Sequence, residues 1–271
     1  MDWNAMAAPW LQVEAQTDAA HGPVLDGIMA RAGLQPGLRV LDIGPGGGVS
    51  LVRAAHAVGP AGHVTGIEIA PPFAKRARAR VPGHVTVDLG DAQTHPFVEG
   101  SYNAAISLFG VMFFEDSVAA FSNIRTALKP GGALTFACWG AREANPWFSM
   151  PGQVAEHVLG PGPAPDPDAP GPMRFGDAQA LDALLRRAGF QPQVEPVDLH
   201  LTPQGHPEEV ADMMMTIGSA TSRMRVAAED GTLSDEQTRA VRAGLVAGFA
   251  EMVEGGAVRV PARINFVRAI A

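Results

Sequence analysis

Residues 40–50 read VLDIGPGGGVS, and we take this stretch as the one that decides the fold. The apolar run Val40–Ile43 predicts a buried parallel strand, because such strands are covered on both faces. Apolar residues then recur at helical spacing, at Leu51, Val52, Ala55 and Val58. The glycines between them permit positive φ and let a ligand approach the backbone amides; they are Gly44, Gly46, Gly47 and Gly48. We therefore predict a strand, a ligand-binding glycine loop and a helix, with a plain turn as the alternative.

Asp42 stands two residues before the first glycine and separates two classes of ligand. A dinucleotide fingerprint needs a small residue at position 49, which is Val49. A carboxylate at position 42 would repel a diphosphate but attract an ammonium group. The pattern D-x-G-x-G-x-G resembles motif I of the class I S-adenosylmethionine (SAM)-dependent methyltransferases. This resemblance implies that Asp42, Gly44, Gly46 and Gly48 hold the methionine part of SAM; Pro45 replaces a cysteine common in that family, without chemical consequence.

Acidic residues also stand at the ends of the next two predicted strands. Glu68 lies in the predicted strand His63–Ile69, about 20 residues past the glycine loop, where a carboxylate can accept bonds from both ribose hydroxyls. Asp91 follows the predicted strand Val85–Leu89, and an ionised carboxylate accepts the hydrogen bonds that the adenine amino group donates. The resemblance gives these two roles to Glu68 and Asp91, with Ile69 and Ala92 beside them. The alternatives are a solvated loop acid at Glu68 and a helix N-cap at Asp91.

A fourth apolar run, residues 104–109, continues into Gly110–Phe114. In open parallel sheets, ligands lie beyond the carboxyl ends of the strands where the strand order reverses. We therefore expect Ser107 and Leu108 at the cofactor, and Phe109 and Met112 in the substrate pocket. Phe113 and Phe114 are expected in the core.

The order of elements extends the resemblance beyond one loop. A predicted helix at 117–128, the sequence KPGG at 129–132 and a predicted strand at 133–139 follow. This order is similar to the quinone-biosynthesis (UbiE-like) branch of the family, and matching segments span residues 38–139. The resemblance implies a doubly wound, seven-stranded Rossmann-like α/β sheet with an antiparallel last strand. It also implies SAM as the cofactor and S-adenosylhomocysteine (SAH) as its product.

The other segments are predicted to surround this core. We predict an N-terminal helical arm or lid at 1–35, a SAM-binding core at 36–140, a lid insertion at 141–176, a core helix and sixth strand at 177–201, a helical cap at 202–257 and a last strand at 258–271. Trp3 and Trp10 are favoured as a packed arm, with a lid over the substrate as the alternative. Trp10, Trp147 and Phe148 are candidates to line the substrate pocket. Residues 213–215, all Met, are favoured as core over a dimer face.

Composition excludes several classes of protein. The chain has 271 residues, 46% of them hydrophobic, which is enough for a large core, and its net charge of −8 disfavours a nucleic-acid partner. Cys138 is the single cysteine, so no disulfide framework is expected. No apolar segment reaches about 18 residues. We expect a bacterial-type cytoplasmic protein without metal or membrane span, and a homodimer stays open.

The implied reaction is methyl transfer from SAM to an O, N or C nucleophile of a small, uncharged or cationic molecule. An oxygen nucleophile needs a base, and no motif identifies one among the eight histidines. His157 and His200 are candidates, although structural roles are favoured for both. A protein that binds SAM without turnover is the alternative. A nicotinamide-dependent oxidoreductase is disfavoured, because Tyr102, the sole tyrosine, is followed by Ile106 instead of the lysine of Tyr-x-x-x-Lys.

Overall fold

A seven-stranded sheet forms the centre of the molecule in the computed structural model, which describes residues 2–162 and 169–271. The strand order is β3-β2-β1-β4-β5-β9-β6. The parallel strands are β1 (Arg39–Ile43), β2 (His63–Glu68), β3 (Val85–Leu89), β4 (Tyr102–Leu108) and β5 (Leu128–Trp139). β9 (Val260–Ile270) runs antiparallel between β5 and β6 (Gln191–Leu201). The predicted sheet with its antiparallel last strand is confirmed.

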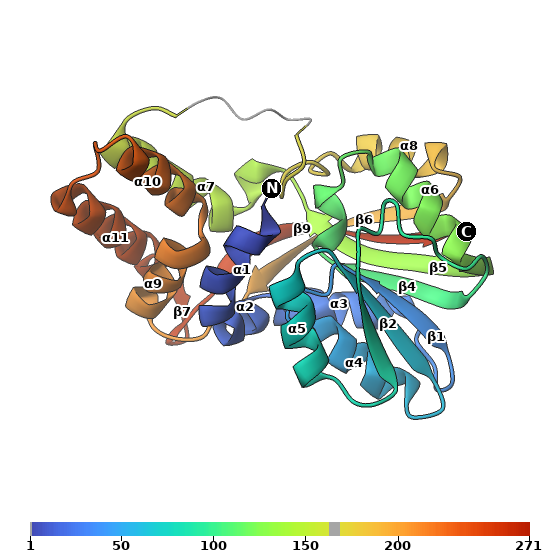
Figure 1. Ribbon diagram of the computed structural model, residues 1–271. Helices are drawn as coiled ribbons and strands as arrows, with labels where there is room; N and C mark the ends of the chain where they lie inside the picture. The colour runs from blue at the N-terminus through green and yellow to red at the C-terminus, as the bar shows by residue number, and fades with distance from the viewer. Residues whose placement is uncertain (1, 163–168) are drawn as a thin grey trace.

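Helices cover both faces of the sheet, which explains why β1 is apolar without alternation. α6 (Ser117–Ala127) and α8 (Ala178–Arg187) lie on one face, and α3 (Gly22–Ala32), α4 (Val49–Val58) and α5 (Pro71–Arg80) lie on the other (Figure 1). Val40, Leu41 and Ile43 are each at most 2% exposed. Burial on both faces selects a continuous apolar run, as the sequence predicts.

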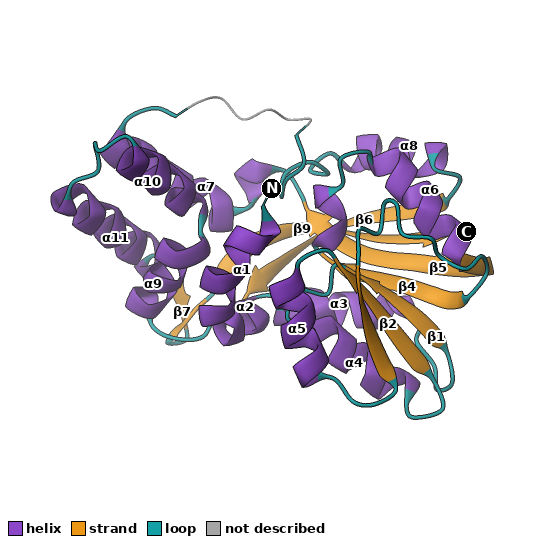
Figure 2. Cartoon of the chain, viewed as in Figure 1, coloured by secondary structure: helices purple, strands orange, loops and turns teal. Residues whose placement is uncertain are grey.

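Four helices pack beside the sheet as a cap: α7 (Pro146–Leu159), α9 (Pro207–Ile217), α10 (Ser219–Glu229) and α11 (Asp235–Ala250) (Figure 2). They come from the two predicted insertions, 141–176 and 202–257, which the structure brings into one group. Part of the predicted lid, residues 163–168, lies outside the described residues. Met213 and Met214 are each 1% exposed inside this cap, so the predicted core role is confirmed for both.

The N-terminal arm consists of α1 (Trp3–Gln12) and α2 (Glu14–Ala20), which lie between the cap and the sheet (Figure 1). α1 contacts both α5 and α9. Glu14 forms ion pairs with Arg76 and Arg80 of α5, and Asp18 also pairs with Arg80. The arm is therefore fastened to the helix that follows β2.

Three boundaries differ from the predictions. The sequence pattern predicts a single helix over 208–229, but the extended backbone of Gly218 (φ −72°, ψ 171°) separates α9 from α10, and a Cβ there would meet the Met214 carbonyl oxygen. The pattern also predicts a last cap helix over 234–254, but α11 ends at Ala250, since Gly255 and Gly256 form the turn of a short hairpin, β7 (Val253–Glu254) and β8 (Ala257–Val258). β5 begins at Leu128 rather than residue 133, because Leu128 already pairs with Tyr102 before a bulge. Two 3-10 turns complete the chain, η1 (Gly110–Phe113) and η2 (Arg142–Ala144).

Candidate active site

The glycine loop lies at the carboxyl ends of β1 and β2. The backbone φ angles of Gly44, Gly46 and Gly48 are 62°, 55° and 94°, values that residues other than glycine rarely adopt. The Gly44 N–H donates to the Ile67 carbonyl at 3.0 Å and fixes the start of the loop. Gly48 begins α4 without a side-chain cap, so the first amides of this helix have no side-chain partner there. The N–H groups of Gly46 and Gly48 already donate to Glu68 and to the Pro45 carbonyl, each at 2.9 Å, so backbone donation by this loop to a ligand stays a prediction.

Asp42 is buried and has no cationic partner among the described residues. Its side chain is 0% exposed, and neither carboxylate oxygen has a hydrogen-bond partner among the described residues. Burial raises the pKa of Asp42 to about 7; the nearby Ser50 hydroxyl opposes this rise, and the charge of Glu68 adds to it. An unpaired buried carboxylate costs free energy until a cation or donor meets it. Asp42 therefore fits a ligand that brings an ammonium group to the loop.

Glu68 joins the end of β2 to the glycine loop. It is 5% exposed, and its two oxygens accept hydrogen bonds from the N–H groups of Gly46 and Ala70, each at 2.9 Å. Burial raises the pKa of Glu68 above its usual range, while the Ala70 and Gly46 donors oppose that rise. The alternative of a solvated loop acid is wrong. Each oxygen keeps a second lone pair with which it can accept from a ribose hydroxyl.

The loop after β3 offers a surface for a flat ring. Asp91 is half-buried, and one of its oxygens accepts from the Gln93 N–H at 2.8 Å in a side-chain turn. No helix begins there in the described chain, so the N-cap alternative is wrong. Ile69 and Leu89 leave neighbouring strand ends with 51% and 50% exposure. Two large exposed apolar side chains beside a polar acceptor suit an adenine.

Ser107 joins β4 to the glycine-loop strand. Its hydroxyl donates to the Ile43 carbonyl at 2.7 Å and accepts from the Gly110 N–H at 3.1 Å. Gly44 and Gly110 pack together, because a Cβ on Gly44 would lie 3.1 Å from the Gly110 Cα. Ser107 therefore fixes the distance between the cofactor loop and the segment after β4, and Leu108 lies half-buried beside it.

Aromatic side chains gather where β4 and β5 end. The Phe109 ring stacks on Trp139 with centroids 4.5 Å apart and an interplanar angle of 3°. Trp147 lies buried on α7, and Phe148 meets Trp139 edge-on at 4.8 Å. We call these four residues the ring cluster. Phe109 has a φ of 63°, the one positive value outside glycine in the described chain, a strained conformation that persists only because the surrounding packing holds it.

His21, at the junction of α2 and α3, completes this side of the site and was missed from the sequence. Its ring meets Phe109, Trp139 and Trp147 edge-on at 5.1, 5.8 and 6.0 Å. Its Nε2 is buried and has no hydrogen-bond partner in the described chain, and burial lowers the pKa of His21 to about 4. No local pattern marks His21, because its neighbours come from residues 109–147.

The other predicted pocket residues lie apart from the ring cluster. Met112 is 1% exposed in the main core, and Phe114 lies in the core as expected. The side chain of Phe113 is half-buried, and its ring contacts Trp3 at 4.7 Å. His157 and His200 are exposed, on α7 and β6. The structure therefore supplies no enclosed surroundings for either predicted base.

The N-terminal arm covers the cofactor side of the site. Trp3 and Trp10 pack with Ala7 against Ala70 and Phe73, directly after Glu68. The Glu14 carboxylate lies against Gly47 and leaves no room for a Cβ there. The predicted packed arm is thus the observed arrangement, and the same contacts bring the arm over the glycine loop.

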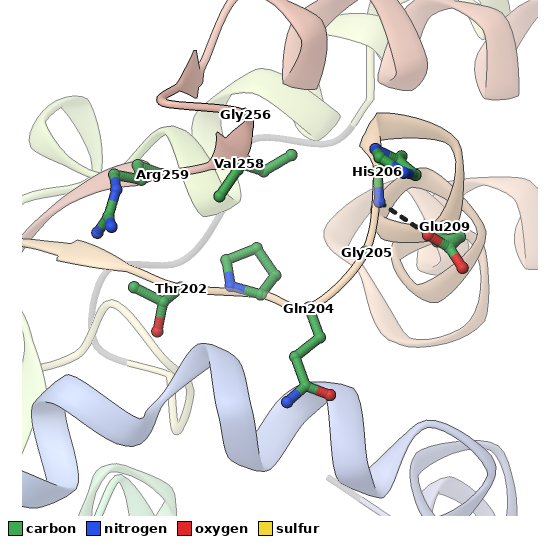
Figure 3. A pocket seen from close by; sticks show the side chains of 10 residues that line it. Thr202, Gln204, Gly205, His206, Glu209, Gly256, Val258 and Arg259 are labelled. Atoms are coloured by element: carbon green, nitrogen blue, oxygen red, sulfur yellow. Dashed lines mark hydrogen bonds between the residues drawn. The ribbon is translucent and has the colours of Figure 1, made fainter.

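A separate hollow of about 410 Å³ lies at the base of the cap, between the end of β6 and the start of β9 (Figure 3). Thr202, Gln204, His206 and Arg259 line it, and the His206 N–H bonds Glu209 at 2.8 Å. None of the predicted site residues lines this hollow. No group of three or more metal-ligating side chains and no helix long and apolar enough to span a membrane occurs within residues 2–162 and 169–271.

Comparison with known proteins shows similarity to methyltransferases. Residues 40–132 match the family Methyltransf_25, a methyltransferase domain. The chain is 31% identical over 195 residues to nocamycin O-methyltransferase of Saccharothrix syringae, which covers 68% of this chain and 60% of that protein. It is 32% identical over 108 residues to the ubiquinone/menaquinone biosynthesis C-methyltransferase UbiE of Shewanella piezotolerans, over 38% of this chain and 43% of that protein.

Solved structures share the fold. A chain of the complex between the Haloferax volcanii Trm112 methyltransferase activator and the putative methyltransferase matches with a TM-score of 0.59 and 17% identity, over 100% of this chain and 96% of that chain. The matched domain and this relative make the chain similar to the class I SAM-dependent methyltransferases. It spans about half the length of the curated relatives it matches.

Proposed function

We propose that this protein transfers a methyl group from SAM to a small organic acceptor. The observation that carries the proposal is Asp42, a fully buried carboxylate with no hydrogen-bond partner in the described chain, at the base of a glycine loop. A cationic amine on the ligand would compensate this charge. A dinucleotide phosphate would be repelled by it.

SAM supplies an activated methyl on a sulfonium when it is bound. In our proposal Asp42 receives the ammonium group and Glu68 receives the ribose hydroxyls through the lone pairs that Gly46 and Ala70 leave free. Asp91 accepts from the adenine amine, with Ile69 and Ala92 beside the ring. The glycine loop holds the remaining polar groups through its amides.

The protein's main contribution to such a displacement is alignment and exclusion of water. Ser107 holds the segment after β4 at a fixed distance from β1, and so positions the ring cluster relative to the glycine loop. Aromatic faces exclude water and attract a sulfonium. The similarity to nocamycin O-methyltransferase supports an oxygen acceptor over nitrogen or carbon.

We further propose that the acceptor is a small molecule and that the protein acts in the cytoplasm without binding nucleic acid. The net charge of −8 and the lack of any Lys or Arg in residues 82–123 support this proposal. The homodimer stays a prediction, which light scattering of the purified protein tests.

Thermal unfolding with SAH, SAM and NAD tests the cofactor. A ligand at about 100 times its Kd adds roughly 2.7 kcal/mol to the free energy of unfolding. SAM and SAH should raise the midpoint of the wild type and of Asp88→Asn, an exposed control, but not of Asp42→Ala. Stabilisation by NAD alone, or an Asp42→Ala variant that still responds, would refute the proposal. SAH binding without methyl transfer to any acceptor would support the alternative of a protein without turnover.

A further inference from the structure

His21 is held rigidly by its backbone while its side chain lacks a partner. Its N–H donates to the Thr17 carbonyl at 3.0 Å, and its own carbonyl accepts from Val24 and Leu25 at 3.0 Å each. Nε2 is enclosed, yet it bonds to nothing in the described part of the chain. Buried polar atoms in native proteins are nearly always paired, so the unpaired Nε2 leaves a place for a hydrogen-bonding group from outside the protein.

The position of His21 connects it with the reacting side of the sheet. Phe109 directly follows β4, and Trp139 ends β5. The strand order reverses between β1 and β4, and ligands of open parallel sheets lie beyond the carboxyl ends at that point. A molecule bound at the ring cluster would thus lie beyond β4 and β5, while the cofactor residues lie beyond β1, β2 and β3.

The chemistry of these surroundings selects the ligand. The stacked pair of Phe109 and Trp139 favours a flat ring over a saturated one. The four members of the ring cluster carry no charge, so nothing in the cluster would pair with an anionic acceptor. The unpaired Nε2 needs a donor, and in the tautomer that carries its proton on Nδ1 it accepts from a hydroxyl.

We propose that the acceptor is a planar hydroxy compound, a phenol or an enol, and that Nε2 of His21 receives the hydroxyl proton during methyl transfer. This inference rests on the proposed function and deepens it. The acceptor oxygen forms a bond to the methyl carbon, the carbon–sulfur bond breaks with its electron pair on sulfur, and the proton passes to Nε2. The products are a methyl ether, a thioether and an imidazolium that releases its proton to solvent.

The charge balance of this step suits a buried base. The positive charge that disappears at sulfur reappears on His21, so the closed site holds one cation before and after transfer. Three uncharged aromatic rings surround His21 and burial lowers its pKa, so the imidazolium gives up its proton readily once transfer is complete. Trp147 and Phe148 belong to α7 of the cap, so displacement of the cap helix would open the cluster to the acceptor while the sheet stays in place.

Binding of a probe is the first measurement, since it does not depend on turnover. With SAH present, 2-naphthol should quench tryptophan fluorescence and bind at least about 10-fold tighter than its saturated analogue, decahydro-2-naphthol. It should also shift the imidazole ¹⁵N resonances of His21, assigned by their loss in His21→Gln. Equal binding of the two probes, or no shift at His21, would overturn the acceptor class.

Turnover with labelled SAM then tests the base. His21→Ala should lower kcat for 2-naphthol by about 100-fold or more with little change in KM, and added imidazole should restore part of it. His21→Gln should bind 2-naphthol within about threefold of the wild type but stay inactive. His56→Gln, an exposed histidine on α4, is the matched control and should keep the wild-type rate.

Stabilisation by SAH separates the two levels of the proposal. If SAH stabilises the wild type and both His21 variants, but 2-naphthol is neither bound nor methylated, the acceptor class is wrong and the cofactor assignment stands. If His21→Ala keeps the wild-type rate, or if His157→Gln or His200→Gln abolishes turnover instead, His21 is not the base. If SAH fails to stabilise the wild type, the proposed function itself fails.

Discussion

Asp42 and His21 are two buried titratable side chains whose surroundings arise in opposite ways. Each lacks a hydrogen-bond partner within the described residues, and burial favours the uncharged form of both. The pKa of Asp42 rises to about 7, and that of His21 falls to about 4. Asp42 lies between Gly66 of β2 and Ile106 of β4 with Ser50 of its own motif nearby, whereas the rings around His21 come from three elements far along the chain. The difference teaches that a sequence motif reveals a site when some of the residues around the functional side chain belong to the motif itself.

The largest expected effect is on the pH dependence of stability at Asp42. Between pH 4 and 7 the unfolded carboxyl is ionised while folded Asp42 keeps its proton, so this group makes the free energy of unfolding fall as pH rises. The full change is about 4 kcal/mol. Asp42→Asn removes it, so the stability of the variant relative to wild type should increase up to about pH 7. Urea unfolding at pH 4.5 to 7.5 measures this, and parallel curves would contradict it.

His21 should act in the opposite direction over an overlapping range. Below pH 6.5 the imidazole of His21 is protonated in the unfolded chain, but in the folded protein it stays neutral down to about pH 4. The unfolded state therefore binds more protons, and the free energy of unfolding falls as the pH falls. The full change is about 3 kcal/mol. His21→Gln should therefore lose less stability than wild type on acidification, whereas exposed His56→Gln should follow wild type. A His21→Gln curve that tracks His56→Gln would show that His21 titrates normally.

Glu68 extends the comparison, because its hydrogen-bond partners lie near it in the cofactor region: the N–H of Gly46 in the glycine loop and the N–H of Ala70 just after β2. Glu68→Gln keeps the size of the side chain but replaces one accepting oxygen by a donor that faces a backbone N–H. We expect SAH affinity to fall by about 10- to 100-fold, as for loss of a charge-assisted hydrogen bond. Titration calorimetry measures it, with exposed Glu99→Gln as the control. Unchanged affinity would remove Glu68 from the cofactor site.

The smallest effect is expected where the N-terminal arm meets the loop. Glu14→Gln weakens ion pairs with Arg76 and Arg80, whose side chains are 44% and 27% exposed, so the loss should stay below about 1 kcal/mol. Asp26→Asn, which breaks an exposed pair with Arg53, is the matched control. Thermal unfolding compares them. A clearly larger loss for Glu14→Gln would mean that the arm is part of the stable core rather than a cover held at the surface.

The sequence by itself determined the central half of this protein. Strand β1, the glycine loop and α4 follow from an apolar run, four glycines and helical spacing within residues 40–58, because local backbone preferences act between near neighbours. The acids at the ends of β2 and β3 follow from the same rule, since parallel strands bring successive carboxyl ends to one edge. The cofactor chemistry could therefore be predicted from the order of residues along the chain.

Only the tertiary structure decided the acceptor side. It joined α7 to α9, α10 and α11 across more than 40 intervening residues and enclosed His21 with Phe109, Trp139 and Trp147. It also left His157 and His200 exposed. Periodicity tells which face of an element is buried but not which distant side chain covers it. That choice depends on how all the elements pack together, so the base and the acceptor site became visible only in the folded chain.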